Sequence, residues 1–173
     1  MEKERVIILN FDIESVSYQA FSEIKAMHAK GQLKVEQMAV VKHSDDGEHR
    51  FEIKDFIDFT GRNHTNKDGL IGMTLGILGG PLGIMLGWFT GSMVGSARDV
   101  KEIKQASTIF EHLVEKIGEG MTGVILSVIE EDNRLLNDLV FYQLKGNITR
   151  LELATVVEEV KEAQALSEEK ALE

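Results

Sequence analysis

Two histidines, His43 and His49, flank the acidic turn sequence Asp45-Asp46-Gly47, and they form the one grouping of metal-binding residue types in the chain that merits a test. Imidazole nitrogens combined with a carboxylate oxygen suit divalent transition metals such as Zn²⁺. If a three-residue loop joins two paired strands here, the histidines face each other and Asp45 or Asp46 can complete the ligand set. With a two-residue loop the histidines do not pair. The sequence favours a simpler interpretation, two solvated histidines beside a turn, so we expect no metal and no cofactor.

Motifs of known catalytic chemistry are missing from the sequence. It contains no Gly-x-x-x-x-Gly-Lys phosphate loop, no Gly-x-Ser-x-Gly nucleophile elbow, no His-Glu-x-x-His zinc motif and no dinucleotide-binding fingerprint. The absence of cysteine excludes a cysteine nucleophile and a disulfide framework, and it fits a reducing compartment. A net charge of −10 opposes non-specific binding to nucleic acid. We therefore expect a non-enzymatic protein of the cytoplasm that does not bind nucleic acid.

The hydrophobic periodicity of the sequence predicts one α+β domain over residues 1–173. The helices and strands of this domain would position any functional site. The predicted elements are, in order, a strand at 5–11, a helix ending at Gly31, strands at 33–43 and 49–59 that form a hairpin, a helix at 103–117 and a strand at 121–130. This β-α-β-β-α-β order is that of a ferredoxin-like antiparallel sandwich, in which two helices cover one face of the sheet.

The C-terminal part predicts an α-β-α extension of this sandwich. Residues 132–145 have helical spacing and end at Gly146. Residues 147–153 are either a strand or the first turns of the last helix, and we favour the strand. The core is expected to consist largely of Phe11, Phe21, Ile24, Phe51, Ile53, Phe110, Leu113 and residues 124–128.

A glycine-rich insertion, residues 69–97, interrupts the pattern between the third predicted strand and the second predicted helix. It holds nine of the chain's sixteen glycines and no charged residue. Two runs of glycines recur every four residues: Gly72, Gly76 and Gly80, and then Gly83, Gly87, Gly91 and Gly95. Such spacing removes side chains from one stripe of a helix, which lets a second helix approach closely. With the turn signal Gly79-Gly80-Pro81 between the runs, the sequence predicts a glycine-zipper hairpin of two helices.

This hairpin must be buried against something, because each glycine costs a helix roughly 1 kcal/mol relative to alanine. The apolar residues expected to make the contact include Leu75, Leu78, Met85, Trp88 and Phe89. The two arms, with ten and sixteen residues, fall short of the roughly 20 residues that span a bilayer. We favour burial against a second subunit, then insertion into a membrane from one side, and then packing within the monomer.

The order of elements and the insertion Gly-Leu-Ile-Gly-Met-Thr-Leu-Gly-Ile-Leu-Gly-Gly-Pro-Leu-Gly resemble a bacterial family of unknown function, number 1269 among such domains. The resemblance extends over about residues 6–153. Members of that family are often labelled membrane proteins because of the insertion. The resemblance implies no reaction, cofactor or catalytic residue.

Together these features predict an interaction protein that forms homo-oligomers, or docks on a membrane surface, through the hairpin. The alternative is a small-molecule binder or enzyme that uses a cleft of the sheet, since ferredoxin-like folds carry many chemistries. A further expectation is that deleting residues 69–97 leaves a folded sandwich.

Overall fold

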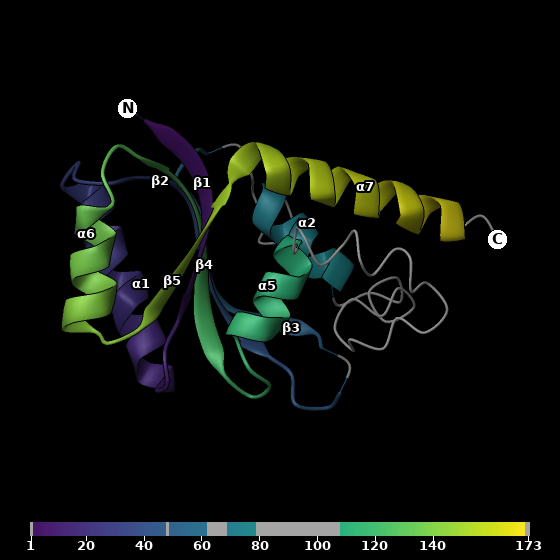
Figure 1. Cartoon of the computed structure of the whole chain (residues 1–173), viewed down its shortest axis with the longest axis horizontal. Helices are drawn as coiled ribbons and strands as arrows, with labels where there is room; N and C mark the ends of the chain where they lie inside the picture. Colours follow the sequence, from purple (N-terminus) through teal and green to yellow (C-terminus); the bar gives the residue numbers. More distant parts are fainter. Residues whose placement is uncertain (1, 48, 62–68, 79–107, 172–173) are drawn as a thin grey trace.

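The protein is built on one five-stranded sheet, which is antiparallel throughout and has the strand order β3-β2-β4-β1-β5 (Figure 1). A computed structural model describes residues 2–47, 49–61, 69–78 and 108–171. Its strands are β1 (Lys3–Asn10), β2 (Lys34–His43), β3 (Phe51–Asp58), β4 (Thr122–Glu130) and β5 (Asn147–Glu152). Its helices are α1 (Glu14–Ala29), α2 (Gly69–Leu78), α5 (Ile109–Lys116), α6 (Arg134–Asn137), the π-helix η1 (Asp138–Gln143) that continues α6, and α7 (Leu153–Ala171). The predicted α+β class is confirmed, as is a strand at 147–152.

Helices cover both faces of the sheet, because its central strands are apolar on both sides. In β1 the run Val6-Ile7-Ile8-Leu9 is completely buried. Val6 and Ile8 belong to one core cluster, and Ile7 and Leu9 belong to the other. Successive side chains of a strand point to opposite faces, so a continuous apolar run requires cover on each face.

The arrangement of the helices differs from the prediction. We expected the first and second predicted helices on the same face, but α1 and α5 lie on opposite faces (Figure 1). α1 shares its face with α6 and η1, whereas α5 shares the other with α2 and α7. β4 lies between β1 and β2, which leaves β3 at the edge of the sheet. β3 is less buried than the central strands, as suits an edge position.

The predicted hairpin of β2 and β3 is confirmed, with His43 opposite Phe51 in the register. The predicted core is also confirmed, except that Ile53 is only partly buried. Within the part of the chain that the structure describes, no helix combines the length and the apolar character needed to cross a membrane.

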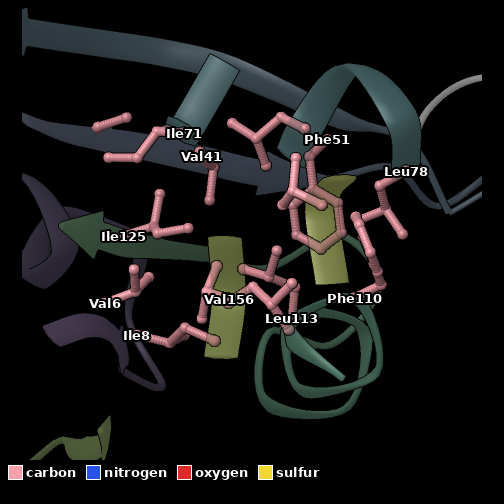
Figure 2. Close-up of a cluster of buried hydrophobic side chains, with 14 of the residues drawn as sticks. Val6, Ile8, Val41, Phe51, Ile71, Leu78, Phe110, Leu113, Ile125 and Val156 are labelled. Atoms are coloured by element: carbon pink, nitrogen blue, oxygen red, sulfur yellow. The ribbon is translucent and has the colours of Figure 1, made fainter. Parts of the chain in front are cut away.

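α2 forms the first arm of the predicted glycine-rich hairpin, and it is part of the core. Ile71, Leu75 and Leu78 are 1%, 4% and 0% exposed, and they pack in the cluster that contains Phe110 and Val156. Figure 2 shows Ile71 and Leu78 of α2 in this cluster. Leu75 and Leu78 were expected to contact a partner or lipid, which is wrong. Their burial follows from the apolar second face of the sheet, which α2 helps to cover. The whole hairpin therefore cannot be deleted without removing core residues.

The start of α5 is held by two acceptors. The Thr108 hydroxyl accepts a hydrogen bond from the Glu111 N–H (3.3 Å), and the carboxylate of Glu159 on α7 accepts one from the Ile109 N–H (3.0 Å). Burial raises the pKa of Glu159 above its ordinary value of 4.5. The hydrogen bond from Ile109 opposes this rise in pKa, while the charges of Glu111 and Glu162 add to it.

Replacing Glu159 with glutamine tests whether burying the charged carboxylate costs stability. Because the folded-state pKa of Glu159 is raised, its carboxyl group contributes stability that is present below the unfolded pKa near 4.5 and is lost as pH rises through the folded pKa. Glutamine keeps an acceptor for Ile109 without the charge. Relative to the parent, the free energy of unfolding of Glu159→Gln should therefore rise from about pH 4 to about pH 7 in urea titrations. The control is Glu158→Gln, at an exposed position on the same helix; an equal rise in both variants would contradict the assignment to burial.

Candidate functional site

His43, at the end of β2, is held in place by the segment between α5 and β4. Its side chain is buried, with the residue 1% exposed, and it stacks on the ring of Phe51 with 4.6 Å between the ring centroids. The backbone N–H of His43 donates to the Met121 carbonyl (3.0 Å), and its carbonyl accepts from the Gly120 N–H (2.8 Å). The imidazole is therefore fixed in position by both its backbone and its ring.

The hydrogen bonds of the His43 ring establish which nitrogen carries the proton. Nδ1 lies 2.5 Å from the carbonyl oxygen of Ile117, which can only accept, so Nδ1 carries the hydrogen and donates it. In the neutral ring Nε2 then keeps its lone pair. Burial lowers the pKa of His43 below 6.5; the hydrogen bond to Ile117 opposes this, and the neighbouring His49 lowers the pKa further. The ring is thus neutral near pH 7, and its Nε2 accepts the hydrogen bond from His49 Nδ1.

His49 and Glu119 complete a cluster around that lone pair. His49 Nδ1 lies 2.8 Å from His43 Nε2 and 3.7 Å from Glu119 Oε1. One ligand atom from each of the three residues lies within 4.8 Å of the other two, and this is the one such group of histidines and acids within the described residues. His49 also has a backbone φ of 55°, which is uncommon for a residue other than glycine. Such conformations occur more often at functional sites than elsewhere.

The structure brings the two candidate histidines together, but Glu119 lies beside them in place of Asp45 or Asp46. His43 and His49 do not face each other across a two- or three-residue turn. Instead, His43 pairs with Phe51, and His49 lies in the longer connection between the strands. Asp46 accepts hydrogen bonds from the Ser44 hydroxyl and Arg50, each 2.8 Å long, and neither it nor Asp45 joins the cluster. Glu119 carries no local sequence signal, because only the pairing of β2 with β4 brings its loop to His43.

The described part of the glycine-rich segment shows two roles for glycine. At Gly69, φ is +79° and an added Cβ would overlap the side-chain amide of Gln37, so a larger residue would be strained and would have to displace that amide. Gly76 instead lies on an exposed side of α2, where an added Cβ would meet nothing within 4 Å. Met73 nearby is 37% exposed. Of the predicted zipper glycines, Gly72 is buried and Gly76 faces open space.

The remaining zipper positions lie outside the described residues. They are Gly80, Gly83, Gly87, Gly91 and Gly95, together with the expected apolar contacts Met85, Trp88 and Phe89. The predicted zipper contact therefore stays a prediction.

A polar hollow of about 280 Å³ lies at the other end of β2 from His43. Its lining includes Glu2, Lys34, Glu131 and Asp132. Asp132 there binds the exposed Arg134, which lowers its pKa through hydrogen bonds. The described residues that line the hollow include charged groups, but among them is no histidine, serine or cysteine that could act as a nucleophile or base near neutral pH.

We compared the chain with models of protein families, with curated proteins and with solved structures. None of the three comparisons finds a match. The resemblance to the bacterial family of unknown function stays a prediction.

Proposed function

We propose that this chain is a non-enzymatic interaction protein that forms homo-oligomers through its glycine-rich segment, residues 69–97. The observation that carries the proposal is the two-sided character of α2. Its apolar side, with Ile71, Leu75 and Leu78, is anchored in the core. Another side leaves Gly76 open and Met73 exposed. The segment therefore starts from a fixed base that still presents a glycine to an approaching helix.

The sequence beyond α2 supports the same proposal. Residues 79–97 contain no charge and include eight large apolar residues: Leu82, Ile84, Met85, Leu86, Trp88, Phe89, Met93 and Val94. Burying each such side chain stabilises by about 1.5 to 3 kcal/mol. A second copy of the chain offers an identical glycine stripe and identical apolar residues, as an isologous interface requires.

We also propose a ferredoxin-like core for the fold, in a different assignment from the one predicted. It consists of β1-α1-β2 followed by β4-α6-η1-β5, with α1, α6 and η1 on one face. The neighbour order β2-β4-β1-β5 supports this assignment. β3, α2, the glycine-rich residues and α5 are then one insertion between the second and third strands of that core. The proposed interaction segment is thus an addition to the core and not one of its connections.

Leucine substitutions at the glycines test the proposal. Gly76→Leu adds a side chain where the monomer has room, so the monomer should stay folded; leucine also favours a helix by roughly 1 kcal/mol over glycine. If another copy packs there, the added side chain blocks its approach. We expect Gly76→Leu, and the double variant Gly87→Leu with Gly91→Leu, to weaken self-association at least about tenfold. Sedimentation velocity over a range of protein concentrations measures the effect.

The matched control is Gln19→Leu, which adds an exposed leucine on α1 at the opposite face of the sheet. It should leave association unchanged. If the parent chain stays monomeric at all concentrations, the proposed homo-oligomerisation is overturned. Flotation of that monomer with lipid vesicles would then favour a membrane as the contact surface.

A further inference from the structure

We propose that His43, His49 and Glu119 form a binding site for one divalent transition metal ion of the zinc class. This site is independent of the proposed oligomerisation. Its ligands would be His43 Nε2, His49 Nδ1 and a carboxylate oxygen of Glu119.

The distances between these atoms suit a shared ion. Zn²⁺ binds imidazole nitrogen at about 2.0 to 2.1 Å, so two ligands of a tetrahedral site lie about 3.3 Å apart. The observed separations, 2.8 Å between the two histidines and 3.7 Å between His49 and Glu119, lie on either side of that value. His43 is rigidly held, whereas the Glu119 side chain is 46% exposed and belongs to a connecting loop. Small adjustments of Glu119 and His49 therefore bring all three atoms to one ion.

The surroundings of His43 are those of a prepared ligand. Metal-bound histidines usually donate their second ring N–H to a backbone carbonyl or a carboxylate, which fixes the tautomer and the ring orientation. His43 donates Nδ1–H to the Ile117 carbonyl, and its ring stacks on Phe51. Its Nε2 lone pair accepts the N–H of His49 Nδ1 in the metal-free chain (2.8 Å), and both nitrogens can bind one ion once that proton is released.

The ligand set selects the class of metal. Two imidazole nitrogens and one carboxylate suit Zn²⁺ and neighbouring transition metals. Mg²⁺ and Ca²⁺ prefer oxygen ligands, so they should bind far more weakly. An ion here would join the loop after β2 to the loop before β4, and so would stabilise the folded chain by mass action.

The test uses the untagged full-length chain, since a histidine tag would bind the same metals. Isothermal titration with ZnCl₂ should show one site per chain, and thermal melting should show a higher Tm with Zn²⁺ than with equal MgCl₂. Glu119→Gln, at a half-exposed position, should weaken Zn²⁺ binding by at least about tenfold, and His49→Ala by about a hundredfold or more. Co²⁺ should give the d–d absorption of a nitrogen- and oxygen-liganded site, and this absorption should be lost in His49→Ala.

Two controls separate this site from other acids. Glu115→Gln removes an exposed carboxylate on α5 close to Glu119 in sequence, and Asp45→Asn removes one of the two β2–β3 loop acids that the sequence offered as candidate ligands. Both should bind Zn²⁺ as the parent does. The proposal is overturned if the parent shows no saturable Zn²⁺ binding, or if Glu119→Gln and Asp45→Asn lower the affinity equally. If His49→Ala does not fold, Glu119→Gln and the parent's Co²⁺ spectrum still decide.

Discussion

Glu130→Ala should lower the free energy of unfolding by about 3 to 5 kcal/mol. The Glu130 side chain is 1% exposed and accepts hydrogen bonds from two arginines. Arg5 donates one bond of 3.0 Å, and Arg150 donates two of the same length, one to each carboxylate oxygen. Without the carboxylate, two mostly buried cations would lose their charge partner, and an unpaired buried charge is costly. Urea denaturation followed by circular dichroism measures the loss.

The adjacent Glu131 provides the control for Glu130, because it is exposed. Glu131→Ala should change stability by less than about 0.5 kcal/mol. If Glu130→Ala also lowered the free energy of unfolding by less than about 0.5 kcal/mol, the two arginines would have found other partners at no energetic cost. That result would contradict the charge argument. The partners to examine in that case are Asn137, which already accepts a hydrogen bond from Arg150, and Asn133, which accepts one from Arg5.

Leu78→Ala should cost about 2 to 5 kcal/mol, because Leu78 is 0% exposed and the truncation leaves a cavity among α2, α5 and α7. The control is Met73→Ala on the same helix. Met73 is 37% exposed, and its sulfur accepts a hydrogen bond from Gln164 (3.1 Å). The free energy of unfolding should therefore fall much less in Met73→Ala than in Leu78→Ala. Equal effects in the two variants would contradict the placement of α2 in the core.

The buried side of α2 determines which deletion of the glycine-rich segment is informative. Removing residues 69–97 takes Ile71, Leu75 and Leu78 out of the core and should give a molten product. A deletion that starts at residue 79 spares them. Comparing the near-UV circular dichroism of the two shortened chains separates the part of the segment that stabilises the fold from the part proposed to associate.

Local patterns in the sequence were enough to predict most of the elements and most of the core. Val6-Ile7-Ile8-Leu9 is too short and too β-branched for a helix, and the turn at residues 45–47 separates two strand-like runs, so the β2–β3 hairpin could be predicted. The four-residue glycine spacing predicted the helix that the structure shows as α2. These features depend on periods of two or of about 3.6 residues, which neighbouring residues in the chain define.

The pairing of distant segments could not be predicted in this way. Nothing local places β4 between β1 and β2, and that placement brings Glu119 to His43 and Glu130 to Arg5. It also sends α5 to the face opposite α1. A strand that is apolar on both sides fits several neighbours equally well, so the choice depends on how the two faces are filled together. The candidate metal site and the buried ion pairs follow from that choice, because their residues are far apart in the chain and meet only when the sheet forms.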